Sequence, residues 1–292
     1  SSSDDRRPKF HLYQAHIALL SGIAWDHINV FPTFENYVEQ FRIFINQLPA
    51  DGVLVYCKED EVVKDLCEKT VLKANKIPYA LPPSKTTDGI TSLIYNNREY
   101  PLQVFGNHNL MNLEGARLVA EQIGIAHQQF LEAITSFKGA ARRLEKVAES
   151  DALIVFKDFA HSPSKLLATT SAVKQQFTKR NVIACMELHT FSSLNEKFLD
   201  QYAGSMNEAD EAIVYFNPHT IAHKKLSALS TDQVKEAFGR SDIKVFNDSD
   251  LLKEYLKKKQ YINDVLLIMT SGNFDGININ SFAAELVTQP TN

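Results

Sequence analysis

Residues 151–188 read DALIVFKDFAHSPSKLLATTSAVKQQFTKRNVIACMEL, and this stretch indicates the fold of the second half of the chain. The apolar runs 152–156 and 182–186 have the length of buried strands, and residues 164–177 between them have helical spacing. Short, nearly continuous apolar strands joined by a helix are typical of a parallel sheet covered on both faces. We therefore predict an α/β fold with a mainly parallel sheet.

The same alternation continues toward the end of the chain. Further strands are predicted at 211–215, 243–246 and 265–269, with helices at 196–205, 231–238, 248–258 and 277–286. In open parallel sheets, ligands bind in the loops that follow the carboxyl ends of the strands. The loops in that position are 157–163, 187–193, 216–220, 247–250 and 270–276.

The first half of the chain alternates strands and helices less regularly. Its predicted strands are 16–23, 53–56 and 79–81, its helices 34–46, 61–74, 109–123 and 126–137, and its hairpin 90–105, with a turn at Asn96-Asn97. Gly139 follows the last of these helices and is a typical helix stop. We therefore predict a first domain at 1–138 and a second domain at 139–292.

Composition limits the classes of function. A chain of 292 residues with 44% hydrophobic and 23% charged residues can bury two cores. Its net charge of -4 offers no basic excess, so no nucleic-acid partner is predicted. No apolar stretch has membrane-spanning length, so no membrane partner is predicted. Cys57, Cys67 and Cys185 are odd in number and widely spaced, which favours a reducing cytoplasm over secretion.

Four short segments carry recognisable motifs. They are IAWDH at 23–27, FGNHNLMN at 105–112, ARRLE at 141–145 and DFAHSP at 158–163. In this order and spacing they resemble the signatures of the Mur ligases, the ATP-dependent amide ligases of bacterial cell-wall metabolism. The resemblance covers nearly the whole chain and implies part of a central domain followed by a Rossmann-like C-terminal domain. Residues 6–10 and 274–277 resemble the murein peptide ligase branch of the family.

The resemblance also implies a reaction and its partners. The ligase phosphorylates the carboxylate of UDP-N-acetylmuramate with ATP, and the amine of the tripeptide L-Ala-γ-D-Glu-meso-diaminopimelate attacks the acyl phosphate. The alternatives are addition of L-alanine to UDP-N-acetylmuramate and a non-catalytic, ligase-derived binding module. No Gly-rich loop ending in Gly-Lys-Ser/Thr is present in the sequence. We therefore expect a fragment of a longer protein that is inactive alone. The sequence does not indicate an oligomeric state.

Two residues are assigned to phosphate chemistry by the resemblance. His27 follows the first predicted strand and would be a catalytic Mg²⁺ ligand, with a loop or capping histidine as the alternative. Arg143 carries a permanent cation in a planar fork, which suits the oxygens of a transferring phosphate. The family's arginine acts in this way across a domain cleft.

A second group of residues is assigned to the nucleotide. Asn109 and Asn112 lie one helical turn apart, so their amides can both face the adenine edge. For Asn107 we favour a capping role at the helix start. Asp158 would accept hydrogen bonds from the ribose hydroxyls or cap a helix, and His161 lines the same loop.

The resemblance places the incoming amine at the loops after two C-terminal strands. The implied contacts are His189, Ser271, Asn273 and Phe274. Thr190 and Ser193 stand where related ligases often carry arginine. We therefore expect the carboxylates of the amine substrate to be bound by other groups.

Overall fold

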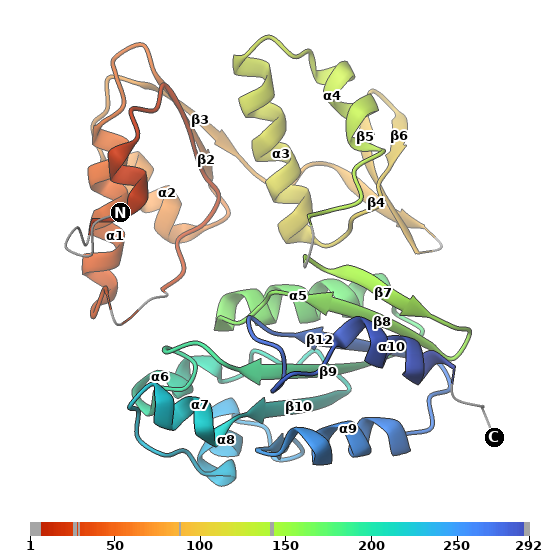
Figure 1. The fold of residues 1–292 in the computed structure, drawn as a ribbon. Coiled ribbons are helices and arrows are strands. Elements are labelled where there is room, and N and C mark those ends of the chain that lie inside the picture. Colours follow the sequence, from red (N-terminus) through yellow and green to blue (C-terminus); the bar gives the residue numbers. More distant parts are fainter. Residues whose placement is uncertain (1–6, 26–27, 29, 88, 141–142, 289–292) are drawn as a thin grey trace. The chain divides into compact units, whose positions relative to one another are not determined.

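A computed structural model describes residues 7–25, 28, 30–87, 89–140 and 143–288. The chain divides into two compact units, Ser1–Phe137 and Lys138–Asn292 (Figure 1). The α/β fold predicted from the sequence is confirmed in both. No helix of the described residues is long and apolar enough to cross a membrane.

The N-terminal unit is built on a three-stranded parallel sheet in the order β1-β2-β3. Its elements are β1 (Ile17–Leu20), α1 (Phe34–Asn46), β2 (Val53–Cys57), α2 (Glu61–Lys69) and β3 (Asn75–Tyr79), preceded by the 3₁₀ turn Lys9–Leu12. The Thr33 hydroxyl accepts the Asn36 N–H at 3.2 Å and caps α1. Asp60 caps α2 through the Val63 N–H and also accepts the Ile23 N–H at 3.0 Å. This carboxylate therefore ties α2 to the loop after β1.

One face of this sheet packs against α1 and α2, and the other face packs against α3 (Asn107–Gln122). A Cβ at Gly115 would lie 2.9 Å from Leu19 Cδ1 and 3.0 Å from the Tyr79 hydroxyl. Helix and sheet approach this closely because residue 115 has no side chain. On the same helix, Arg117 is 8% exposed and pairs with Glu114 and Glu121.

A small antiparallel sheet completes the N-terminal unit. It contains β4 (Ser84–Thr87), β5 (Ile90–Tyr95) and β6 (Arg98–Pro101), and α4 (His127–Ile134) packs against it. Asn96 and Asn97 have φ values of 49° and 59°. Consecutive left-handed residues are what a two-residue hairpin turn requires, so the predicted turn is confirmed.

The C-terminal unit contains a six-stranded sheet in the order β11-β10-β9-β12-β8-β7 (Figure 1). The strands are β7 (Glu145–Glu149), β8 (Leu153–Asp158), β9 (Asn181–Leu188), β10 (Glu211–Phe216), β11 (Lys244–Phe246) and β12 (Asp264–Met269). All pairs are parallel except β7 with β8. The helices are α5 (Pro163–Gln176), α6 (Glu196–Leu199), α7 (Pro218–His223), α8 (Thr231–Phe238), α9 (Ser249–Lys258) and α10 (Ile279–Val287).

Both faces of the large sheet are covered. Leu252 and Leu256 of α9 and Phe282 of α10 share one apolar cluster with side chains from β8, β9, β10 and β12. Against the other face, the Phe156 ring lies 5.6 Å from the ring of Phe177 at the end of α5. This burial on two sides explains why these strands read as nearly unbroken apolar runs.

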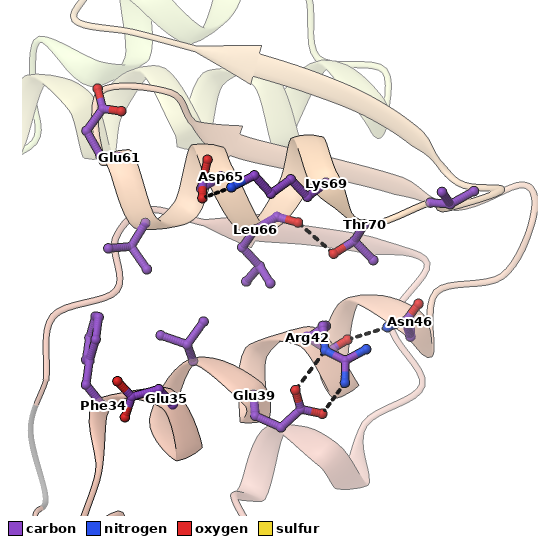
Figure 2. Close-up of a pocket in the computed structure, with 13 residues that line it drawn as sticks. Phe34, Glu35, Glu39, Arg42, Asn46, Glu61, Asp65, Leu66, Lys69 and Thr70 are labelled. Atoms are coloured by element: carbon purple, nitrogen blue, oxygen red, sulfur yellow. Dashed lines mark hydrogen bonds and ion pairs between the residues drawn. The ribbon is translucent and has the colours of Figure 1, made fainter.

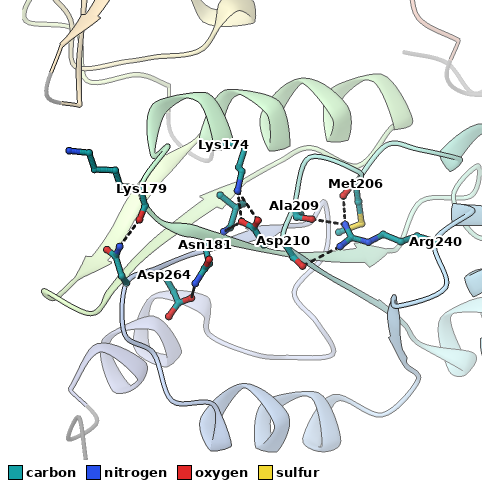
Figure 3. Close-up of polar contacts among 10 residues, drawn as sticks. Lys174, Lys179, Asn181, Met206, Ala209, Asp210, Arg240 and Asp264 are labelled. Carbon is teal, nitrogen blue, oxygen red and sulfur yellow. Dashed lines mark hydrogen bonds and ion pairs between the residues drawn. The ribbon is translucent and has the colours of Figure 1, made fainter.

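Polar contacts hold the amino ends of the central strands (Figure 3). The Arg240 guanidinium donates to three backbone carbonyls within residues 206–210 at 2.7–3.2 Å. Asp210 accepts hydrogen bonds from Lys174 and from the Val182 N–H at 2.6–2.8 Å. These contacts fix the entry into β9 and β10 and have a structural role.

Several element boundaries differ from the sequence prediction. The predicted helix 61–74 ends at Lys69, because Thr70 turns extended and donates its hydroxyl to the Leu66 carbonyl. β3 therefore starts at Asn75, before the predicted strand 79–81. The predicted helix 196–205 ends at Leu199 and continues as the 3₁₀ turn Asp200–Tyr202. Strands β4 and β7 were not predicted.

Candidate functional site

Three loops predicted to bind ligands lie side by side in the C-terminal unit. β12 pairs in parallel with both β8 and β9, and Met269 at its end is in register with Asp158 and with Met186. The loops 157–163, 187–193 and 270–276 therefore leave the same edge of the sheet next to one another. This arrangement is the expected position of a binding site in such a sheet.

Asp158 anchors the loop after β8. Its side chain is buried, and its two carboxylate oxygens accept the N–H groups of Leu144 and Ala160, each at 2.6 Å. In the same loop, His161 Nδ1 lies 2.8 Å from the Phe159 carbonyl, and the ring is 8% exposed. Both residues therefore shape the loop, and their contact with ribose stays a prediction.

Arg143 lies beside this loop. Its guanidinium carbon is 5.6 Å from the centre of the Phe159 ring, a cation–π distance. The residue is exposed, and its contact with a phosphate stays a prediction. The Leu144 N–H bond to Asp158 holds the adjoining backbone. Arg143, Asp158 and His161 are thus brought together, although their positions in the sequence are up to 18 residues apart.

Two of the predicted amine contacts are enclosed in the structure. The Phe274 side chain is 2% exposed, and its ring lies 5.7 Å from that of Tyr215, so it packs in the core and not in a pocket. Ser271 Oγ is enclosed and has no hydrogen-bond partner among the described residues. Burial, helped by the carboxylates of Asp275 and Glu187, raises the pKa of Tyr215 to about 12, so this phenol stays neutral.

Thr190 and Ser193, which the sequence resemblance places where related ligases often carry arginine, form a turn. The Thr190 hydroxyl accepts the Ser193 N–H at 3.1 Å, and Ser193 Oγ lies within 3.2 Å of the Thr190 carbonyl. Ser193 is fully buried. These two side chains therefore stabilise the loop after β9, and Ser193 cannot contact a substrate in this conformation. His189, in contrast, has a side chain that is 36% exposed.

A cavity of about 290 Å³ opens beside these loops. Its polar wall includes Lys157, Asp158, Asn273, Asn278 and Asn280. Lys157 Nζ lies 3.2 Å from Asn280 Oδ1, so a cation and several amides face one space. Sequence reasoning did not single out Lys157. Its position directly before the DFAHSP motif, at the end of a predicted strand, is the signal that could have identified it.

The predicted adenine contacts lie at the start of α3. The prediction that Asn107 caps this helix is wrong, because Gly106 is the N-cap residue and no side chain bonds there. The Asn109 amide donates to the Phe105 carbonyl at 2.8 Å and closes the first turn. Asn112 is exposed one turn later. The role of both amides toward adenine stays a prediction.

His27, the predicted Mg²⁺ ligand, and Asp26 lie outside the described residues. In the part of the chain that the structure does describe, no group of three or more His, Cys, Asp or Glu side chains could hold a metal ion. The Mg²⁺ prediction therefore rests on the resemblance alone.

A larger groove of about 900 Å³ lies between α1 and α2 in the N-terminal unit (Figure 2). Its charged side chains pair along their own helices, Arg42 with Glu39 and Lys69 with Asp65. None of the predicted site residues lines this groove. We therefore place the candidate site at the strand ends of the C-terminal unit.

Two family models match the chain. The Mur ligase middle domain matches residues 2–120, and the Mur ligase, glutamate ligase domain matches residues 142–272. The chain belongs to the Mur ligase family. The two matched regions fall within the two compact units and contain all the predicted site residues except Asn273 and Phe274.

Similar proteins include UDP-N-acetylmuramate–L-alanine ligases. The one from Arthrobacter sp. (strain FB24) is 31% identical over 224 residues, which are 73% of this chain and 48% of that protein. The one from Caldanaerobacter subterraneus is 28% identical over 282 residues, 90% of this chain and 60% of that protein. The chain thus spans about half to three fifths of these relatives.

Solved structures share the fold. The UDP-N-acetylmuramate-alanine ligase from Thermotoga maritima has a TM-score of 0.66 at 17% identity and covers 93% of this chain and 60% of that chain. The murein peptide ligase from Psychrobacter arcticus has a TM-score of 0.61 at 19% identity, covering 98% and 60%. At these identities the likeness extends to the fold alone.

Proposed function

We propose that this chain is the middle and C-terminal part of an ATP-dependent ligase that joins an amine to the carboxylate of UDP-N-acetylmuramate. The observation that carries the proposal is the match of two consecutive Mur ligase domains across most of the chain. The convergence of the loops after β8, β9 and β12 supports it, since it supplies one site for several substrates.

The proposed reaction has two steps. The carboxylate attacks the γ-phosphorus of ATP, and ADP leaves with formation of an acyl phosphate. The amine then attacks the acyl carbon, phosphate leaves, and the nitrogen loses a proton. Mg²⁺, with His27 as its proposed ligand, would neutralise phosphate charge. A solved ligase from Thermotoga maritima with the same fold is in complex with ADP.

We assign the contacts with ATP and with the amine to separate residues of this chain. The exposed Arg143 guanidinium would bind the transferring phosphate oxygens, where charge develops. Asn109 and Asn112 would contact adenine, and Asp158 and His161 would hold the β8 loop that faces the nucleotide. The exposed edge of His189 would face the incoming amine.

Two amine substrates remain. The similar L-alanine ligases favour L-alanine, the alternative in the sequence interpretation. A specific observation favours the tripeptide as second candidate: the cavity of about 290 Å³ presents Lys157 and amide side chains. A cation and amides suit the additional carboxylates of L-Ala-γ-D-Glu-meso-diaminopimelate. Lys157 would then replace the arginines missing at 190 and 193.

The test uses the full-length protein with UDP-N-acetylmuramate and ATP. L-alanine and the tripeptide are compared by phosphate release and by the mass of the product. A higher specificity constant for L-alanine supports the first candidate, and one at least about tenfold higher for the tripeptide supports the second. Absence of both products, with nucleotide binding retained, would leave the non-catalytic binding module as the function.

A further inference from the structure

One buried carboxylate, Glu187, connects the loops after β9 and β12. It is the last residue but one of β9 and is 1% exposed. Its Oε2 accepts the Phe274 N–H at 3.0 Å and a hydrogen bond from the Thr270 hydroxyl. Thr270 Oγ1 in turn accepts the Gly272 N–H at 2.7 Å. A single oxygen of Glu187 therefore organises the backbone from residue 270 to residue 274.

The loop after β12 depends on such an anchor. Phe274 and Asp275 have φ values of 49° and 59°, a left-handed conformation that side-chain-bearing residues rarely adopt. Three hydrogen bonds hold it: the Glu187 bond to the Phe274 N–H, a bond from the Gly276 N–H to Asn273 Oδ1 at 3.0 Å and a bond from the Ile277 N–H to the Asn273 carbonyl at 2.8 Å. The loop is consequently a fixed wall beside the exposed His189.

The second oxygen of Glu187 faces this histidine. Glu187 Oε1 lies 3.4 Å from His189 Nδ1. The ring also rests on Gly272, where a Cβ would lie 2.6 Å from Nδ1, 2.7 Å from Cγ and 2.8 Å from Glu187 Oε2. Gly272 is not among the positive-φ glycines, so its backbone conformation does not itself require glycine. The missing side chain instead leaves the space that the imidazole of His189 occupies.

We propose that Glu187 and Gly272 are positioning residues for His189. The negative charge of Glu187 Oε1, 3.4 Å from Nδ1, favours the tautomer with the imidazole proton on Nδ1, and Gly272 leaves room for the ring to lie against the β12 loop. Both residues lie on the Nδ1 side of the ring, so we assign the 36% exposed part of the side chain to the edge that carries Nε2. The tautomer leaves the Nε2 lone pair as an acceptor for an N–H of the incoming amine. This last step rests on the proposed function.

The tautomer can be measured without ligase activity. Long-range ¹H–¹⁵N spectra of the 292-residue chain at about pH 8.5, well above the usual imidazole pKa, report which ring nitrogen of His189 carries the proton, with His189→Gln providing the assignment. We expect Nδ1–H in the native chain. In Glu187→Gln the amide oxygen must accept the Thr270 and Phe274 donors, so its NH₂ faces Nδ1 and the proton moves to Nε2.

A matched control keeps this result specific. Asp275→Asn removes one negative charge from the same region without touching His189, and asparagine tolerates the left-handed backbone. It should leave the Nδ1–H tautomer unchanged. An Nε2–H tautomer in the native chain, or no change in Glu187→Gln while the remaining amide spectrum stays native, overturns the proposal.

A second variant tests the role of Gly272 in the full-length protein. Gly272→Ala should raise the KM for the amine by about tenfold and leave the KM for ATP unchanged. In a His189→Ala background the same substitution should raise the amine KM clearly less, because the imidazole is gone and only the contact with Glu187 Oε2 remains. Equal effects in both backgrounds would mean that Gly272 acts on the loop and not through His189. A native protein that ligates no amine would refute the proposed function and leave the tautomer result to stand alone.

Discussion

Replacement of Asp158 measures how firmly a buried carboxylate holds the loop after β8. Each of its oxygens accepts one backbone N–H at 2.6 Å, from Leu144 and Ala160, and the residue is 4% exposed. Asparagine keeps the shape but has one accepting atom, so Asp158→Asn loses one bond and leaves a buried N–H against an amide N–H. A hydrogen bond to a charged group contributes about 1.5 to 3 kcal/mol. We expect that loss of stability for Asp158→Asn.

Urea unfolding of the 292-residue chain provides the assay. The single tryptophan, Trp25, lies in the N-terminal unit, whereas far-UV circular dichroism reports both units. With a slope of about 1 to 3 kcal/mol per molar urea, Asp158→Asn should lower the midpoint of the C-terminal unit by about 1 M. The fluorescence transition of Trp25 should stay in place, because the substitution lies in the other unit.

Asp151→Asn is the matched control. Asp151 is an exposed carboxylate just before β8, and its replacement should change stability by less than about 0.5 kcal/mol. If Asp158→Asn were no more destabilising than Asp151→Asn, the carboxylate would not anchor the loop. The packing of neighbouring side chains would then have to hold the loop after β8 in place.

Three further predictions address charge and turnover. Burial raises the pKa of Glu211, but hydrogen bonds from Lys259 and Tyr255 bring it below the usual value of 4.5. The native chain should therefore be more stable than Glu211→Gln at pH 7, and the difference in free energy of unfolding should shrink as pH falls below about 4.5. A constant difference in urea titrations across this pH range would contradict the lowered pKa. Lys157→Met in the full-length protein should raise the KM for the tripeptide by about tenfold and leave that for L-alanine within about twofold; equal effects on both amines would remove Lys157 from carboxylate binding. Arg143→Ala should depress kcat with little change in the KM for ATP, since charge moves onto the transferring oxygens in the transition state, and a change in the ATP KM alone would show a ground-state contact.

Much of the fold was predictable because its signals are local. The predicted helix 231–238 matches α8, whose Ser230 and Gln233 form a capping box and whose C-cap is the left-handed Gly239. The predicted helix 34–46 matches α1, whose N-cap is Thr33. Strand β7 was missed, since its sequence EKVAE has little apolar character. It is a strand because its neighbour β8 offers a free edge for pairing.

The site shows the same division. The rule that ligands bind at strand ends predicted five loops, whose polar residues could be read directly from the sequence, and the strand order of the sheet showed which three of them are adjacent. The rule could not show that Phe274 packs into the core or that Ser193 is buried in a turn. Asp158 was recognised as important, but its bond from the Leu144 N–H was not, because Leu144 lies 14 residues earlier, directly before β7.

The sequence by itself determined most of the strands, most helix starts and stops, and which polar loops follow which strands, since periodicity, caps and turn residues act over a few neighbouring positions. Only the tertiary structure decided that Glu187 would meet Thr270 and Phe274, which lie 83 and 87 residues further along the chain. β9 and β12 are neighbours in the sheet although two strands separate them in the sequence. A buried carboxylate is stable only where such a neighbour brings donors to it, and the order of strands that supplies them follows from packing of the whole domain.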